Sequence, residues 1–301
     1  MDTSHIAVPS PFFSISLSIS PQELAARIGR ADAPLLLDVR REETFLASPH
    51  LLAGARRCAP EHVTAFAATQ PQQEVVAYCV YGHNASEDAV ATLRAAGWSA
   101  RLLAGGLAGG EDRVDTPQDI AAWRAQHLPM MRKRPDLGVS GEQRSRWITR
   151  ERPKIDRIAC PWLVRRFIDT RAEFFYVPTA KVFEEAARLG AVAYDIPGAP
   201  VSHEGELCSF DTLLSAFELT DPALQTLARI VRGADTDRLS LAAQSAGLLA
   251  FSLGLSGLHA GDDHAMLQAA LPLYDALYAW CRSAQDEPHS WMPETMMGAV
   301  R

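Results

Sequence analysis

Short apolar runs alternate with amphipathic segments along the chain up to about residue 128. Apolar runs of this kind predict strands, and apolar residues spaced three and four apart predict helices. We expect strands at 35–39, 55–58, 74–79 and 101–103, and helices at 23–28, 43–47, 61–68, 86–96 and 116–127. Strands that alternate with helices indicate an α/β domain, in which helices flank a parallel-rich sheet.

Helical periodicity dominates from residue 147 onward. There we expect helices at 156–169, 179–189, 209–218, 221–232, 240–254 and 262–284, and short strands at 147–150, 173–177 and 191–195. This pattern predicts a mainly helical α+β domain. Residues 129–146 combine Pro, Gly, Ser and charged side chains with little periodic hydrophobicity, which is typical of a linker. We therefore predict a first domain at 1–128, a basic linker at 129–146 and a second domain at 147–301.

Cys79 is the side chain that most clearly suggests chemistry. It ends the predicted strand 74–79, and a short polar loop connects it to the predicted helix 86–96. A thiol over a helix N-terminus has backbone N–H groups and a favourable dipole directed at it, which stabilise the thiolate. The sequence thus predicts a nucleophilic cysteine. The loop that would hold its substrate consists of Val80, Tyr81, Gly82, His83 and Asn84.

Asp38 and Arg40 lie at the end of the neighbouring predicted strand, in the sequence Leu-Leu-Asp-Val-Arg. An unpaired charge at the end of a buried strand is costly. We expect both side chains to bind neighbouring loops as structural support rather than to contact substrate.

A second group of reactive side chains lies in the second domain. His203, Glu206 and Cys208 occur within six residues before a predicted helix, and Asp235 lies near the end of another helix. Imidazole, thiolate and carboxylate groups suit a transition metal such as zinc or iron, and a thiol at a helix start also suits an oxyanion. In the alternative interpretation His203 and Cys208 only pack and cap locally. We take His203, Glu206, Cys208 and Asp235 as the candidate metal ligands.

Other acidic and aromatic residues in this domain have plainer interpretations. Asp156 at a helix N-terminus is expected to be a cap, and so are Asp262 and Asp263 beside His264. Trp162 and its apolar neighbours at helical spacing are expected to belong to the core.

Composition narrows the classes of partner. The formal net charge is −7, and residues 1–128 carry 10 basic and 14 acidic side chains, which disfavours binding to nucleic acid. The basic cluster at 132–134 is interpreted as a solvated linker. No apolar stretch is long enough to cross a membrane. Five widely spaced cysteines without a C-x-x-C pair, and a start without basic residues before Arg27, favour the reducing cytoplasm.

Residues 35–110 resemble a single-domain rhodanese in three motifs, Leu36–Arg40, Tyr78–His83 and Leu103–Leu107. The resemblance implies a sulfurtransferase without a cofactor. In that family the cysteine takes a sulfane sulfur from a small donor as a persulfide and passes it to a thiophilic acceptor. The six-residue loop has the rhodanese size, shorter than the loop of the related dual-specificity phosphatases. It contains no Lys or Arg, so the donor would be bound by backbone N–H groups and His83.

Residues 147–285 resemble the C-terminal domain of chromate-resistance proteins of the ChrB type, in the stretches 147–169, 194–198, 202–211 and 230–237. The resemblance implies an oxyanion such as chromate as a partner. Our first hypothesis is a rhodanese-type sulfurtransferase that acts in chromate or sulfur-oxyanion stress. The alternatives are a chromate-responsive regulator with an accessory rhodanese domain, or an inactive scaffold. A regulator should carry a basic helix-turn-helix in its N-terminal half, which this sequence does not suggest.

Overall fold

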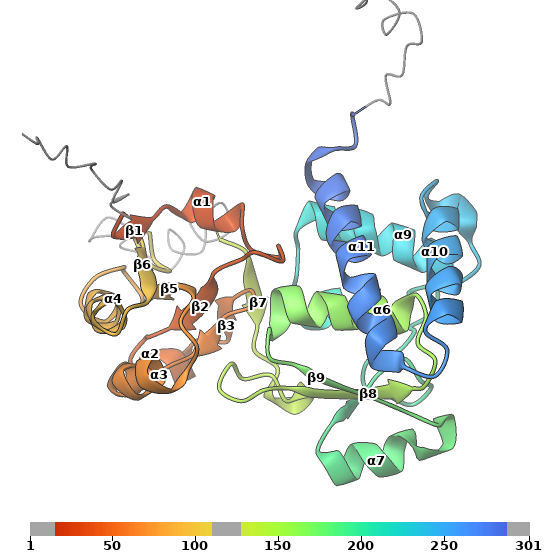
Figure 1. Cartoon of the computed structure of the whole chain (residues 1–301), viewed down its shortest axis with the longest axis horizontal. Coiled ribbons are helices and arrows are strands. Elements are labelled where there is room, and N and C mark those ends of the chain that lie inside the picture. The colour runs from red at the N-terminus through yellow and green to blue at the C-terminus, as the bar shows by residue number, and fades with distance from the viewer. Residues whose placement is uncertain (1–15, 110–127, 288–301) are drawn as a thin grey trace, which may run out of the picture. The chain divides into compact units, whose positions relative to one another are not determined.

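The computed structural model describes residues 16–109 and 128–287 (Figure 1). The chain divides into two compact units. The first contains the residues up to Leu128 apart from 29–31, and the second contains 29–31 and the residues from Pro129 on. The helix predicted at 116–127 lies outside the described residues. Among the described helices, none has both the length and the apolar character that a bilayer span requires.

The first unit is built on a five-stranded sheet whose neighbouring strands are all parallel. The strand order is β1 (Ser18–Ile19), β6 (Ser99–Leu103), β5 (Glu74–Tyr78), β2 (Leu35–Asp38) and β4 (Arg56–Arg57). The helices are α1 (Pro21–Ala25), α2 (Glu42–Ala47), α3 (Val63–Thr69) and α4 (Ala85–Ala95), and β3 (His50–Leu52) is a further short strand. The predicted α/β class is confirmed. The strands β1 and β3 were not predicted, because two or three residues are too few for a period.

The core of this unit fixes the positions of β2 and β5. Leu37 of β2 and Ala77 of β5 are partners in the parallel ladder, and both are fully buried. Trp98 is also buried, and its indole N–H donates a 3.1 Å hydrogen bond to the carbonyl of Ala67. Because β2 and β5 are parallel neighbours, the residues that follow them, including Cys79, lie at the same edge of the sheet.

The second unit combines a small sheet with a group of helices, as predicted. Its parallel sheet has the order β10 (Val192–Ala193), β8 (Arg146–Arg150) and β9 (Glu173–Val177). The helices are α6 (Asp156–Leu163), α7 (Val182–Leu189), α8 (Ser209–Ala216), α9 (Pro222–Asp235), α10 (Ser245–Leu258) and α11 (Asp263–Ser283). Helix α7 packs on the sheet, whereas α9 packs against α8, α10 and α11 (Figure 1). Trp162 is fully buried between α6, α8 and α11, as expected for a core residue.

Residues 129–146, predicted as a linker, are instead packed into the second unit. They form β7 (Met130–Arg132) and a 3₁₀ turn at Pro135–Leu137, and Met131 is fully buried. The N–H of Arg132 donates to the carbonyl of Phe217, and its guanidinium pairs with Glu218 at 2.8 Å. Apart from β7 and the 3₁₀ turn, the segment is mostly irregular, which agrees with its lack of a helical or strand period.

Helix α6 contains a proline at position 161, which removes the N–H that would bond to the carbonyl of Arg157. The buried hydroxyl of Tyr194 donates to this carbonyl instead, at 3.2 Å. Beyond Leu163 the chain continues as a π-helical turn, Val164–Ile168, so the predicted helix 156–169 has two parts. The proline therefore ties the helix to the segment that follows β10.

Candidate functional site

Cys79 lies at the carboxyl end of β5, directly before the loop that leads to α4. Its side chain is largely buried, with 8% of the residue exposed. The thiol lies 3.1 Å from the carbonyl oxygen of His83 and 3.2 Å from the hydroxyl oxygen of Ser86. The sulfur is thus enclosed by its own loop and by the first turn of α4, which is the position expected for a nucleophile at the end of a strand.

The backbone of the loop is held closely against the segment after β6. Gly82 has a φ of +82°, and a Cβ there would lie 2.7 Å from the carbonyl oxygen of Leu103 and 2.8 Å from the N atom of Gly106. The N–H of Leu107 in turn donates to the carbonyl of Cys79 at 3.1 Å. These contacts leave no room for a Cβ at position 82, so the close backbone approach requires glycine. They fix the position of the sulfur relative to the loop.

The remaining loop side chains point in different directions. Tyr81 and His83 stack with ring centroids 6.1 Å apart, and Nδ1 of His83 lies 2.9 Å from the side-chain amide nitrogen of Asn84. Asn84 has a φ of +49° and starts α4 through a capping box with Glu87. Within the described residues, the N–H groups of Tyr81, Gly82 and His83 donate to no protein acceptor. They remain available to an anion that lies beside Cys79.

A hollow of about 540 Å³ lies beside this loop. Asn84 and Arg41, the residue before α2, both contribute to its wall, and Cys79 is not among the residues that line it. Three carboxylate side chains, Glu42, Glu61 and Asp88, line the same hollow.

Asp38 and Arg40 form a buried ion pair beneath the loop, and Arg40 also donates to the carbonyl of His50 at 3.0 Å. Burial is nearly complete, with 0% of Asp38 and 2% of Arg40 exposed. The hydroxyl of Tyr78, the residue before Cys79, donates to the carboxylate of Asp38 at 3.1 Å. These contacts are those of structural supports that link β2, β3 and β5, as the sequence suggested.

The second unit brings His203 together with three carboxylates. Nε2 of His203 lies 3.1 Å from Oδ2 of Asp235, 3.3 Å from Oδ1 of Asp195 and 3.6 Å from Oδ2 of Asp156. Asp156 is fully buried, and its carboxylate accepts the N–H groups of Ser209 and Phe210 at the start of α8. It therefore caps a neighbouring helix rather than its own.

The same arrangement shifts several pKa values. Hydrogen bonds to Asp156 and Asp195 raise the pKa of His203 to about 10. Burial and the charges of Asp156 and Asp195 raise the pKa of Asp235 to about 7. Burial opposes the ionisation of Asp195, but hydrogen bonds from His203 and Ser209 outweigh it and lower its pKa. The protonation states of these residues therefore depend on one another.

Two of the predicted metal ligands lie apart from His203 and Asp235. Glu206 pairs with Arg238 at 3.1 Å, and its side chain is 82% exposed. Cys208 is the N-cap of α8, and its thiol lies 3.3 Å from the carboxylate of Asp211. Burial raises the pKa of this thiol far above its usual range. The predicted set of metal ligands was thus wrong for these two residues. They were included because they lie close to His203 in sequence, but their side chains contact Arg238 and Asp211 instead.

In the structure Asp156 and Asp195, rather than Glu206 and Cys208, lie beside His203. The sequence interpretation gave Asp156 only a capping role, and it gave Asp195 no role. Asp195 has a φ of +51° and follows β10, and Ile155 before Asp156 has a φ of +35°. Strained backbone beside two carboxylates is a frequent mark of functional sites, but it is not visible in a sequence.

Asp262 caps a helix as the plainer interpretation predicts, whereas Asp263 binds a different segment of the chain. Asp262 accepts the N–H of Ala265 as the N-cap of α11, and Asp263 accepts the N–H of Arg152. The imidazole of His264 packs edge-on against Tyr176. These residues do not join the cluster around His203.

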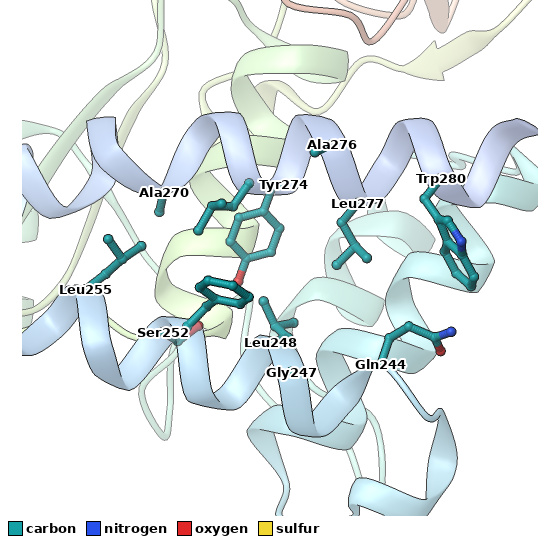
Figure 2. Close-up of a pocket in the computed structure, with 12 residues that line it drawn as sticks. Gln244, Gly247, Leu248, Ser252, Leu255, Ala270, Tyr274, Ala276, Leu277 and Trp280 are labelled. Carbon is teal, nitrogen blue, oxygen red and sulfur yellow. The ribbon is translucent and has the colours of Figure 1, made fainter. Parts of the chain in front are cut away.

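An apolar hollow of about 390 Å³ lies between α10 and α11 (Figure 2). Leu248 of α10 and Leu277 and Trp280 of α11 line it (Figure 2). Phe251 of α10 also contributes to its wall. The hydroxyl of Tyr274, which also lines this hollow, donates to the carbonyl of Ile155. No acidic, basic, histidine or cysteine side chain is among the described residues that line it, so we assign it no chemistry.

The first unit presents a cysteine and a six-residue loop at the end of β5 of a parallel sheet. Residues 20–112 match the family described as rhodanese-like domain, and residues 147–281 match the family described as ChrB, C-terminal domain. The chain is therefore similar to a different family in each of these two regions. The predicted resemblances are confirmed.

Individual proteins are similar to parts of the chain. Protein ChrB of Cupriavidus metallidurans is 32% identical over 137 residues, a match that covers 45% of this chain and 40% of that protein's length. A rhodanese homologue from Thermus thermophilus is 28% identical, with a TM-score of 0.26, and the match covers 31% of this chain and 98% of that one. A rhodanese-like domain from Anabaena is 27% identical, with a TM-score of 0.25 and coverage of 33% and 98%.

Proposed function

We propose that the rhodanese-like domain is a sulfurtransferase that carries sulfur on Cys79. The thiolate of Cys79 attacks the outer, sulfane sulfur of a donor, the bond from that sulfur to the rest of the donor breaks, and the remainder leaves with the electron pair. A thiophilic acceptor then attacks the terminal sulfur of the persulfide and regenerates the thiolate. The observation that carries this proposal is the position of Cys79 at the carboxyl end of β5, with its sulfur enclosed by its own loop, in a region that matches the rhodanese-like family.

The charged side chains near the loop after Cys79 affect which sulfur donor can bind. Arg41 is the one cationic side chain that lines the hollow beside Asn84, within the described residues, and three carboxylates share that wall. A dianion such as thiosulfate would be repelled by these carboxylates more than a monoanion would. We therefore favour a persulfide or polysulfide monoanion as the donor.

The second domain supplies the physiological setting of the proposal. Its likeness to ChrB supports action in chromate or sulfur-oxyanion stress, in which analogues of sulfate deplete the reduced sulfur of the cell. All five cysteines are free in the structure, which suits the reducing cytoplasm that we propose as the location. The competing function is a chromate-responsive regulator whose rhodanese domain has no activity, and the retained Cys79 argues against it.

The test is mass spectrometry of the full chain after incubation with polysulfide or, separately, thiosulfate. We expect one added sulfur atom, absent from Cys79→Ser, and faster labelling by polysulfide. Cys58→Ser is a matched control, because Cys58 is a buried thiol of the same unit whose pKa burial raises. Sulfur addition that persists in Cys79→Ser, or no addition with either donor, contradicts the sulfurtransferase and favours the regulator.

A further inference from the structure

Four segments of the second unit contribute side chains to one point. Asp156 starts α6, Asp195 follows β10, His203 lies in the loop before α8, and Asp235 ends α9. We call these residues the His203 cluster. One ligand atom from each of Asp156, Asp195 and His203 lies within 4.8 Å of the other two. Their convergence depends on the tertiary structure and is independent of the proposed role of Cys79.

The distances within the His203 cluster suit a shared cation. Nε2 of His203 has carboxylate oxygens at 3.1, 3.3 and 3.6 Å. Ligand atoms around a tetrahedral metal with bonds of 2.0–2.1 Å are separated by about 3.3 Å. A protonated imidazole has one hydrogen on Nε2 and can donate to only one of these three oxygens. Ser209 donates to the other two through its N–H and its hydroxyl, which holds both carboxylates toward His203. A divalent ion binds several of these oxygens at once.

The carboxylates are already oriented by other groups of the protein. The carboxylate of Asp156 is held by the N–H groups of Ser209 and Phe210. Asp195 accepts the hydroxyl of Ser209 at 2.9 Å and the guanidinium of Arg150 at 3.1 Å. Outer contacts of this kind orient metal ligands before the ion arrives.

The side chains of the His203 cluster differ in exposure. The side chain of Asp156 is fully buried, those of Asp195 and Asp235 are 8% and 18% exposed, and that of His203 is 40% exposed. The imidazole is therefore the member of the cluster most open to solvent.

The donor atoms indicate the class of ion. The two nearby thiols each donate to a carboxylate: Cys160 donates to Oδ1 of Asp156 at 3.6 Å, and Cys208 donates to Asp211 at 3.3 Å. One imidazole nitrogen with carboxylate oxygens suits Mn²⁺, Fe²⁺ or Zn²⁺ better than a thiophilic ion. We propose that the second domain binds one divalent first-row transition-metal ion through His203, Asp156 and Asp195, with Asp235, which lies 3.1 Å from Nε2 of His203, as a fourth ligand.

The experiment titrates the full chain, first stripped with a chelator, with Mn²⁺. Electron paramagnetic resonance counts the free ion, and Mn²⁺ is used because this hard ion avoids the thiols of the chain. We expect a single strong site in the wild type, and affinity lower by about tenfold or more in His203→Gln and Asp235→Asn. Asparagine keeps an oxygen that can accept the N–H of Asp156, which helps the second variant to fold.

The matched control is Asp237→Asn, an exposed carboxylate two residues beyond Asp235, which should bind Mn²⁺ as the wild type does. Circular dichroism checks folding, and pulsed measurements on the wild type should show a nitrogen from His203 bound to Mn²⁺. The proposal is overturned if the wild type has no strong Mn²⁺ site. It is equally overturned if folded His203→Gln keeps wild-type affinity, or if the bound ion in the wild type shows no nitrogen ligand.

Discussion

The hydroxyl of Tyr78 donates a 3.1 Å hydrogen bond to the carboxylate of Asp38, although 40 residues separate them in sequence. The two residues are partners in the parallel ladder between β2 and β5. Burial and the charge of Asp38 raise the pKa of Tyr78 well above its usual value, so it remains a donor at physiological pH. This contact fixes the strand that ends at Cys79.

Asp38→Ala should lower the free energy of unfolding by about 3–5 kcal/mol, because it leaves the guanidinium of Arg40 buried without its carboxylate. Persulfide formation per folded molecule should fall much less. Denaturant unfolding and mass spectrometry of the folded fraction measure the two effects. Glu42→Gln is the control, since Glu42 pairs with Arg57 but its side chain is 57% exposed. An unchanged melting temperature with lost activity would instead make Asp38 a catalytic residue.

Gly82→Ala should abolish most persulfide formation and lower stability by more than the 1–3 kcal/mol or so of a positive φ alone. The added methyl group would lie 2.7–2.8 Å from backbone atoms of the segment after β6. Gly138→Ala is a matched control, because Gly138 has a φ of +68° and open space around it. Thermal unfolding of both variants separates the stability lost through the steric contact from the stability lost through the positive φ. Equal losses in the two variants would show that close approach at Gly82 is unimportant.

Tyr194→Phe should cost about 1–3 kcal/mol of stability, because the carbonyl of Arg157 loses its donor and Pro161 cannot replace it. Denaturant unfolding of the full chain checks this value in the transition of the second unit. Tyr81→Phe is the control, since its ring is partly exposed and its hydroxyl has no comparable buried acceptor. A cost near zero would mean that solvent or a shift of α6 satisfies the carbonyl.

Glu74→Gln should show a stability effect that depends on pH. Glu74 pairs with Arg27 and Arg101, both at 2.6 Å, and the hydrogen bond from Arg27 lowers its pKa. A carboxyl group with a lowered folded pKa stabilises the protein above its unfolded pKa of about 4.3, and this contribution is lost as pH falls through the folded pKa.

The expected difference between Glu74→Gln and wild type is about 1 kcal/mol at neutral pH, since partial exposure screens the ion pairs. It should shrink toward zero in acid. Unfolding experiments across this pH range measure it, with Glu23→Gln as a control, because Glu23 also pairs with Arg101 but is 53% exposed. A difference that grows as pH falls would contradict the assigned direction of the pKa shift.

The sequence by itself determined the local elements and the position of Cys79. The period of apolar residues identifies β2, β5 and α4, because burial on one face acts over neighbouring residues. A cysteine between a strand and a helix start then follows directly from the chain order. The support roles of Asp38 and Arg40 were also predictable, since a charge at the end of a buried strand requires a partner.

Only the tertiary structure decided which side chains meet His203. Asp156 caps a helix that begins 53 residues later, and Asp195 and Asp235 arrive from separate segments. Glu206 lies near His203 in sequence but pairs with Arg238 at the surface. Local periodicity reports which face of an element is buried, whereas ligand atoms converge only when several elements pack together. The distances within the His203 cluster therefore depend on long-range packing that no local pattern records.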